Sequence, residues 1–418
     1  MPTTRTPTTS PQTSAAPPRL HLLDLLRFGA AAAVLVYHFT ATPTASHYWG
    51  QDVPTLFGGL NEVTRYGWLA VEAFFVISGF AILWSTQGRG VAQFVGSRVG
   101  RLYPALWACV LATAVLQAFW TDGRRLGWGE TLANLTMAPD LFGAQLSQVV
   151  YWTLLVELKF YVLVGLLLAL GPITRGRALT LALGWPAAGI ALRALGYPEV
   201  AEHFVVRHAV YFGIGMVLFL LWQDSRDRAA GAGPDRRAAL TTAAALGLLL
   251  ALAAARVVES ADAASSLQGV PVSPVVAVGV FAASVAAVWA STRPWAQVRH
   301  PRLAAAAVTA GALTYPVYLV HTQFGWAVTQ WLTGLGVGTA LTLAAASAVS
   351  LLLAAAIHHG VERPAHRPLR RATTAACTRL AERYRRRVAP APASPRVTSD
   401  THFLGADVTP TTPQVTLR

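Results

Sequence analysis

The chain has 418 residues, of which 54% are apolar and 12% are charged, whereas soluble domains usually carry about 25% charged residues. Its formal net charge of +14 comes almost wholly from arginines that fall between apolar stretches and in the C-terminal tail. A nucleic-acid-binding protein would carry a basic face on a soluble domain instead. The two cysteines, Cys109 and Cys377, imply neither a disulfide framework nor a metal site. The composition therefore indicates an integral membrane protein.

Apolar stretches recur along the chain at the length of a membrane span, about 20 residues each. We expect an all-α fold, a polytopic bundle of about ten transmembrane helices. Their expected positions are residues 20–41, 66–86, 102–120, 148–170, 177–196, 203–223, 237–256, 274–292, 303–324 and 334–358. Residues 131–146 offer a further short or re-entrant segment, so eleven spans is the alternative.

Arginine is unevenly divided between the expected loops. The loops on the side of the N-terminus carry fourteen arginines before the tail is counted, whereas the opposite loops carry five. Cytoplasmic loops of membrane proteins are enriched in Lys and Arg. Ten helices with both termini in the cytoplasm are therefore self-consistent, whereas a single extra span would invert the later loops.

Both ends of the chain differ from the membrane domain that we expect over residues 19–371. Residues 1–18 are rich in Thr and Pro and lack a signal-peptide core. We interpret them as a disordered cytoplasmic arm. Residues 372–418 begin with an arginine-rich amphipathic stretch and become rich in Pro, Thr and Ser. We expect a largely disordered cytoplasmic tail that lies near anionic lipid.

The first expected helix carries charged groups, which cost about 2.5–3.5 kcal/mol each at the centre of a span. Asp24, Arg27 and His38 lie on one stripe, together with Ala31 and Leu35, because three- and four-residue steps follow one helix face. Asp24 and Arg27 can neutralise each other as an ion pair at the cytoplasmic end of this helix. His38 lies about 16 Å further along the axis. A single membrane histidine is often only a packing residue, so His38 alone does not decide the function.

Polar residues also fall in the second and third expected helices. Glu72 is interpreted as a buried polar partner rather than a general base, and Ser78-Gly79 as a small-residue packing patch. Arg98 and Arg101 precede the third expected helix. If this segment is helical, they share a face and their guanidinium groups can clamp phosphates. The alternative is the ordinary positive charge of an inner loop.

Two later helices carry further candidates. Glu157 and Tyr161 lie one turn apart on the fourth helix, so they share a face. Tyr315 stands on the ninth helix, where Thr314, Tyr318 and His321 align on one face. Such a face either lines a polar cavity or makes hydrogen bonds between helices.

Taken in order, these segments resemble the acyltransferase-3 family of bacterial membrane O-acyltransferases. The resemblance covers residues 19 to about 371. The motifs that carry it are Asp24-x-x-Arg27 leading to Tyr37-His38, Phe74-Phe75-Val-Ile-Ser-Gly-Phe80, Arg98-x-x-Arg101-Leu-x-Pro104, Trp152-x-x-x-x-Glu157-x-x-Phe160-Tyr161, Tyr315-x-x-Tyr318-Leu-x-His321 and Val361-Glu362-Arg363-Pro364. Any one motif is weak, but six in sequence are specific. Glu72 stands where the family usually has Asp.

The resemblance implies an enzyme of the bacterial cytoplasmic membrane that moves an acyl group, commonly acetyl, from cytoplasmic acyl-CoA to a hydroxyl. Acceptors in the family are usually sugars of surface glycans or glycosylated metabolites, and neither a permanent cofactor nor a metal is implied. His38 would be the general base, with Glu157 orienting the base or the acceptor. The acyl-CoA-binding residues would be Arg27, Arg98 and Arg101, and the supporting residues Asp24, Glu72, Tyr161, Tyr315, Tyr318 and His321.

The competing hypothesis is a transporter or flippase that uses the buried charges as a proton relay. The sequence has no inverted repeat and no pair of interrupted helices of the kind that secondary transporters favour. The acceptor, the acyl chain length and the oligomeric state are left open by the sequence.

Overall fold

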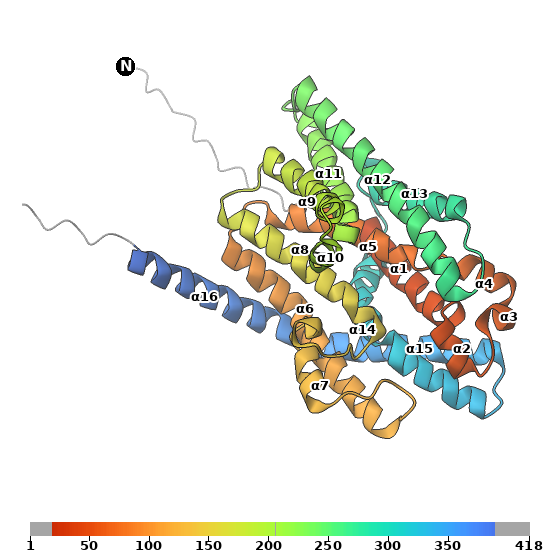
Figure 1. Cartoon of the computed structure of the whole chain (residues 1–418). Helices are drawn as coiled ribbons and strands as arrows, with labels where there is room; N and C mark the ends of the chain where they lie inside the picture. Colours follow the sequence, from red (N-terminus) through yellow and green to blue (C-terminus); the bar gives the residue numbers. More distant parts are fainter. Residues whose placement is uncertain (1–18, 205, 389–418) are drawn as a thin grey trace, which may run out of the picture. The chain divides into compact units, whose positions relative to one another are not determined.

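The computed structural model describes residues 19–204 and 206–388, and every element in these ranges is helical (Figure 1). This confirms the expected all-α fold. Helices stand at all the expected positions: α1 (His21–Thr40), α5 (Leu69–Thr86), α6 (Val91–Phe119), α8 (Trp152–Ala169), α9 (Arg175–Ala194), α11 (Val206–Ala229), α12 (Arg236–Gln268), α13 (Pro274–Ser291), α14 (Pro301–Gly334) and α15 (Thr339–Ile357).

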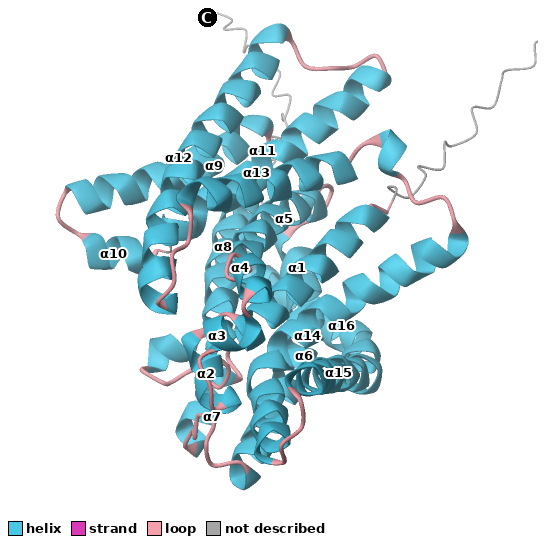
Figure 2. Cartoon of the chain, turned by 90° about the vertical axis from the view of Figure 1, so that its right-hand side faces the viewer, coloured by secondary structure: helices cyan, strands magenta, loops and turns pink. Residues whose placement is uncertain are grey.

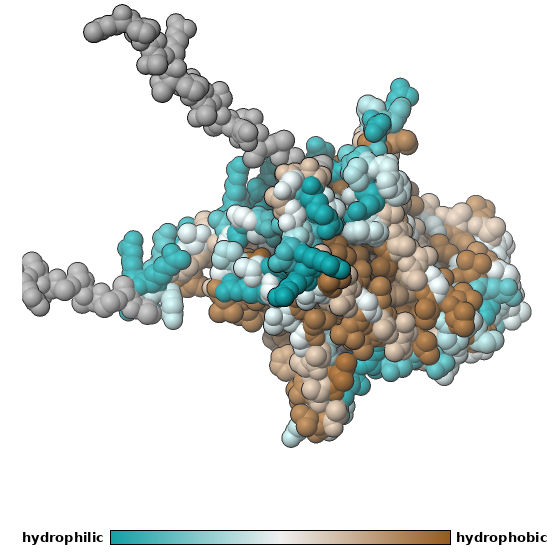
Figure 3. All heavy atoms as spheres, turned by 90° about the horizontal axis from the view of Figure 1, so that it is seen from above, coloured by the Kyte–Doolittle hydropathy of each residue, from teal (hydrophilic) through white to brown (hydrophobic). Residues whose placement is uncertain are grey.

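Eight helices in the described part of the chain are long and apolar enough to cross a membrane. They are α1, α5, α6, α8, α12, α13, α14 and α15. The protein is thus a multi-pass membrane protein, and the face seen in Figure 3 carries wide areas of hydrophobic side chains. The helices α9 and α11 fill the other two expected positions but are not among the eight. Ten crossings and cytoplasmic termini stay predictions.

Short helices occupy the segments between the long ones. Residues 131–146 form no spanning helix, since α7 (Trp128–Asn134) and the 3-10 turn η1 (Pro139–Phe142) are far shorter than a span. The short helices α2 (Pro43–Trp49), α3 (Val53–Phe57), α4 (Gly59–Thr64) and α10 (Pro198–His203) were not expected from the sequence. Local signals were present, because α2, α3 and α10 each have a proline in their first turn.

The third long helix begins earlier than expected. We expected its start at residue 102, but α6 begins at Val91, after Gly90 in an extended conformation. Pro104 lies inside α6 and does not end it. Consequently Arg98 and Arg101 stand on a helix rather than in a loop, which is the condition that the phosphate-clamp hypothesis required.

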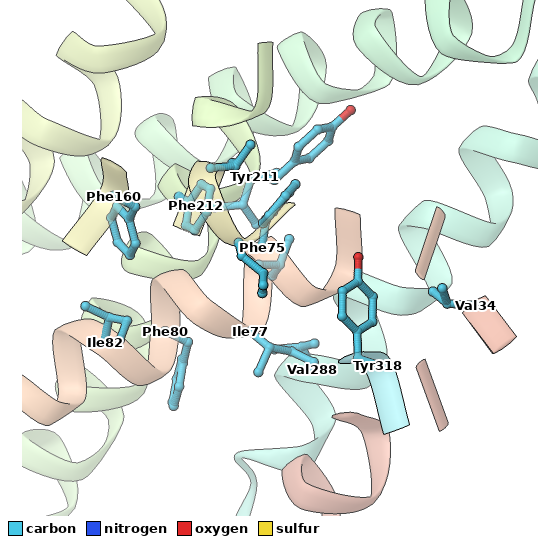
Figure 4. Close-up of a cluster of buried hydrophobic side chains, with 14 of the residues drawn as sticks. Val34, Phe75, Ile77, Phe80, Ile82, Phe160, Tyr211, Phe212, Val288 and Tyr318 are labelled. Atoms are coloured by element: carbon cyan, nitrogen blue, oxygen red, sulfur yellow. The ribbon is translucent and has the colours of Figure 1, made fainter. Parts of the chain in front are cut away.

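Helices α5 and α11 cross at two glycines. A Cβ atom on Gly79 would lie 2.1 Å from the carbonyl oxygen of Phe212, and one on Gly215 would lie 2.0 Å from that of Val76. Only residues without a side chain allow backbones to approach this closely. The packing interpretation of Ser78-Gly79 is therefore confirmed for Gly79. Phe75, Phe80 and Phe212 gather around this crossing (Figure 4).

Helix α1 lies beside α14 and α5, and α14 also packs against α15 and α6 (Figure 2). Glycines on α14 bring α1 close. A Cβ atom on Gly311 would lie 2.8 Å from the Cβ atom of Asp24, and one on Gly325 would lie 2.1 Å from the Phe39 ring. The polar stripe of α1 is therefore held against α14 at both ends.

After α15 the chain passes through a π-helical turn (His358–Glu362) into α16 (Arg363–Val388). The chain divides into two compact units between Cys377 and Thr378. The end of the membrane domain was expected at residue 371, which also lies inside α16. Residues 372–388, expected in a largely disordered tail, are helical. Alanine, leucine and arginine favour helix there. The expected arm over residues 1–18 and the tail over 389–418 lie outside the described residues.

Candidate active site

A cavity of about 60 Å³ lies between α1, α5, α8 and α14. It has room for a few water-sized groups. Apolar residues from α5 and α8 form one part of its wall, among them Phe74 and Phe75. The polar part of the wall consists of Arg27, Ser78, Thr153, Glu157, Thr314, Tyr315 and Tyr318. The structure thus brings together residues that were selected from the sequence on four separate helices.

Glu157 is the acidic group in the cavity wall. The Ser78 hydroxyl donates a hydrogen bond of 2.7 Å to its Oε1 atom. One turn further along α8, Tyr161 is buried, and its ring centroid lies 5.8 Å from the guanidinium carbon of Arg98. This contact joins α8 to α6. The shared face of Glu157 and Tyr161, inferred from their spacing, therefore has a cationic partner on the neighbouring helix.

Three guanidinium groups lie near Glu157 or Tyr161. Arg98 and Arg101 on α6 and Arg27 on α1 all interact electrostatically with Tyr161, and Arg27 and Arg98 also interact with Glu157. The Nε atom of Arg27 is buried and has no hydrogen-bond partner among the described residues. Positive charge therefore exceeds negative charge in this region, and Arg27, which lines the cavity, has one donor left unused. Such an arrangement suits a multiply charged anion such as a phosphate ester.

Asp24 makes its ion pair with a different arginine from the one expected. Its Oδ2 atom lies 2.9 Å from Nε of Arg19. In the described residues Asp24 makes no direct ion pair with Arg27, although the two charges still attract each other. Helix α1 begins at His21, so Arg19 lies just before the helix and can fold back on the first turn, where Asp24 stands. Arg27 is directed instead at the cavity, which it lines.

His38 lies beside a second histidine. The ring centroids of His38 and His321 are 5.2 Å apart, on the facing helices α1 and α14. Tyr37 and Trp326 stand at 5.3 Å and 6.2 Å from the His38 ring. The indole of Trp326 also donates a 3.3 Å hydrogen bond to the backbone oxygen of His38. His38 is thus enclosed by aromatic rings and by one imidazole.

Tyr318 stands between the histidine pair and the cavity. It lines the cavity, and its ring centroid lies 5.8 Å from that of His321. Its hydroxyl is 2.8 Å from Oγ1 of Thr153 and donates a weaker bond to the backbone oxygen of Val150. The predicted alignment of Tyr318 and His321 is therefore found. Within residues 19–204 and 206–388, no hydrogen bond or ion pair joins Glu157 to His38, and a role for Glu157 in orienting His38 stays a prediction.

Glu72 and Tyr315, two more residues that were expected to support the site, lie in different places. Glu72 is buried outside the cavity, with its Oε2 atom 3.5 Å from Nδ1 of His208 on α11. A polar side chain thus stands close to Glu72, as expected for a buried polar residue, but the two atoms make no hydrogen bond. His208 was not predicted from the sequence. Tyr315 lines the cavity, and its buried hydroxyl lacks a hydrogen-bond partner in the described chain. In that same part of the chain, no cluster of three or more His, Cys, Asp or Glu side chains could hold a metal ion.

An apolar helical bundle that encloses arginines, a carboxylate and two histidines defines a multi-pass membrane protein with an internal polar site. The chain belongs to the acyltransferase-3 family, because residues 20–359 match the family's acyltransferase domain. This confirms the resemblance inferred from the motifs. The chain is also 29% identical over 218 residues to acyltransferase MdmB of Streptomyces mycarofaciens, which is 49% of this chain and 52% of that protein. It thus matches about half the length of this curated relative. No solved structure matches the chain.

Proposed function

We propose that the protein is a membrane-bound O-acyltransferase that moves an acyl group, commonly acetyl, from acyl-CoA to a hydroxyl of a sugar or glycosylated acceptor. The observation that carries this proposal is an enclosed cavity with an arginine and a carboxylate in its wall, next to a pair of histidines that Tyr318 separates from it. Arg27 lies at the cavity, and His38 lies further along the same helix. Membership of the family supports the reaction class.

The chemistry needs a base at the acceptor hydroxyl. The hydroxyl oxygen attacks the thioester carbonyl carbon, a new C–O bond forms, and the C–S bond breaks. His38 takes the hydroxyl proton and returns it to the sulfur of the leaving CoA thiolate. Imidazole is suited to both steps, since its ordinary pKa lies near neutrality. No oxidant, reductant or metal is required for this balance.

Arginines would hold the donor at the other end. Arg98 and Arg101 offer guanidinium forks that can bind CoA phosphates in a bidentate way. Arg27 would assist from α1, and the pantetheine arm would pass Glu157 and Tyr318 toward His38. The arginine-rich loops expected on this side favour a cytoplasmic location for it by the positive-inside rule. Cytoplasmic acyl-CoA would therefore enter where the arginines stand, at the bacterial plasma membrane.

The proposal is tested with labelled acetyl-CoA and native membrane vesicles, which carry both the protein and its acceptor. The His38→Ala variant should release CoA more slowly by roughly 10²–10⁴-fold, the usual contribution of a general base. The matched control is His300→Ala, which removes the exposed histidine that precedes α14 and should leave the rate unchanged. A stably inserted His38→Ala protein with full acyl transfer would remove His38 from the mechanism.

The donor site has a separate test. Arg98→Ala and Arg101→Ala should weaken the binding of acetyl-CoA before they alter acceptor affinity, whereas Arg89→Ala, an exposed arginine before α6, should not. Unchanged CoA affinity in both variants would end the phosphate-clamp hypothesis. A transporter that used these groups as a proton relay would release no CoA and give no acylated product in either experiment.

A further inference from the structure

The surroundings of His321 determine which of its ring nitrogens carries hydrogen. Its Nδ1 atom lies 3.2 Å and 3.0 Å from the backbone oxygens of Val317 and Tyr318. A carbonyl oxygen can only accept, so Nδ1 must be the donor. A neutral imidazole has one N–H group, and Nε2 therefore carries a free lone pair. His321 is fully buried, and this Nε2 atom has no hydrogen-bond partner in the described chain.

The imidazole of His38 is the polar group placed to use that lone pair. The two rings are 5.2 Å apart between centroids and tilted by 50°. Ring nitrogens lie away from the centroids, so this separation allows a rotated His38 ring to form a hydrogen bond with His321. The Nδ1 atom of His38 is likewise buried and without a partner in the described residues. Each of these neighbouring histidines therefore has a buried nitrogen without a hydrogen-bond partner.

The spacing of the two helices is fixed at this point. Gly325, one turn after His321 on α14, leaves room for the fully buried ring of Phe39, which follows His38. The Trp326 indole holds the backbone oxygen of His38. The histidines thus face each other across a rigid contact between α1 and α14, as required of groups that must meet with a defined geometry.

We propose that His321 is a positioning residue for His38 and acts as a neutral hydrogen-bond acceptor. In this role Nε2 of His321 accepts a hydrogen bond from one N–H of His38, which leaves the other His38 nitrogen free to take the acceptor's proton. The bond strengthens while His38 is an imidazolium. His321 keeps its own proton throughout. A carboxylate performs the corresponding task in Ser-His-Asp triads.

This inference rests on the proposed function, because it assigns a role relative to the His38 base. Its test compares His321→Ala with His321→Gln, since the glutamine oxygen can still accept a hydrogen bond. Initial rates of CoA release from acetyl-CoA are measured in native membrane vesicles, at equal amounts of inserted protein. We expect His321→Ala to lower kcat by about tenfold or more, short of the roughly 10²–10⁴-fold effect of losing the base. The KM for acetyl-CoA should stay unchanged, and His321→Gln should recover most of the rate.

A double-mutant cycle distinguishes a positioning role for His321 from a merely structural one. Because His321 acts through His38, adding His321→Ala to His38→Ala should cause no further loss of rate. Additive losses, equal rates for the Ala and Gln variants, or a fully active His321→Ala protein would each overturn the positioning role. A fully active His38→Ala protein would instead refute the proposed base, so the two failures are distinguishable.

Discussion

The hydroxyl of Ser78 on α5 donates a 2.7 Å hydrogen bond to the carboxylate of Glu157 on α8, and both side chains line the same cavity. This bond holds a carboxylate in the wall of the cavity, where Arg27 and Arg98 interact with it electrostatically. Its strength depends on the charge of Glu157, because hydrogen bonds to charged groups are stronger than those between neutral ones. Ser78 therefore contributes to the site and is more than the small packing residue that the sequence suggested.

Replacing Ser78 by alanine should weaken both the fold and the site. The Ser78→Ala change leaves Glu157 with one donor fewer, which should cost about 1.5–3 kcal/mol. Thermal unfolding in detergent and the rate of CoA release are the measurements. Ser85→Ala is the matched control, since that hydroxyl bonds within its own helix to Ile82 at 2.7 Å. Equal effects of the two substitutions would contradict a special role for the Ser78–Glu157 bond.

The crossing of α5 and α11 should not tolerate a side chain. Gly79→Ala and Gly215→Ala each drive a methyl group onto a backbone oxygen, at 2.1 Å and 2.0 Å. Overpacking of this kind usually costs about 1–3 kcal/mol, and more where only backbone could yield. A Cβ atom on Gly247 of α12 would meet nothing within 4 Å, and Gly247→Ala should be neutral or stabilising by up to about 1 kcal/mol. The order of the unfolding temperatures tests this prediction.

These glycines show how far the sequence could predict the packing. Gly79 lies next to Ser78, and that small-residue pair in an apolar helix indicated a close approach. Gly215 gave no such indication, because a single glycine in a span has several uses and its partner helix is unknown from sequence. Helix positions followed from the length of apolar runs. The helix pairs depend on long-range side-chain complementarity, which no local pattern contains.

Two glycines on α14 should separate donor binding from catalysis. Gly311→Ala presses on Asp24, whereas Gly325→Ala presses on Phe39, the neighbour of His38. We expect Gly311→Ala to raise the KM for acetyl-CoA at the arginine end, with the smaller effect on kcat. Gly325→Ala should lower kcat with little change in that KM. Steady-state kinetics of CoA release in membrane vesicles measure both quantities. The same kinetic change in both variants would mean that α1 responds as one rigid unit.

Residues of the candidate site could be predicted from the sequence where a charged or histidine side chain lies inside an apolar membrane helix. Asp24, Arg27 and His38 were found because membrane helices rarely carry such residues without a reason. The ion pair of Asp24 with Arg19 was missed, since the exact start of α1 decides whether Arg19 can fold back. His208 was missed for another reason. It lies near the start of its helix, where a polar residue is ordinary, and only the fold reveals Glu72 beside it.

Replacing Arg98 by lysine should weaken the binding of acetyl-CoA. Its guanidinium group lies within 5.9 Å of the Phe94 ring centroid and 5.8 Å of that of Tyr161. Arginine stacks on rings and binds phosphates with a planar fork, whereas lysine is a compact point charge. We therefore expect Arg98→Lys to keep the protein folded but to bind acetyl-CoA nearly as weakly as Arg98→Ala. Equilibrium binding of labelled acetyl-CoA to detergent-solubilised protein measures this. Full affinity in the lysine variant would show that charge alone suffices.

The buried ion pair of Arg175 and Asp224 should govern stability without affecting the reaction. Asp224 is 1% exposed, and Arg175 binds both of its oxygens while also donating a 2.8 Å hydrogen bond to Thr242. These residues tie together α9, α11 and α12, and none of them lines the cavity. Arg175→Ala leaves a buried carboxylate without its counter-ion, which should cost about 3–5 kcal/mol.

Replacing both partners by apolar residues, as in Arg175→Met with Asp224→Leu, should recover most of that loss, because neither charge then remains buried. The double variant should also keep the wild-type KM for acetyl-CoA. Unfolding temperatures in detergent test the first expectation, with Arg237→Ala as the control for an exposed arginine at the start of α12. A double variant as unstable as Arg175→Ala would mean that the pair stabilises the contact between the three helices by its geometry, and that the cost of removing its charges from water is small by comparison.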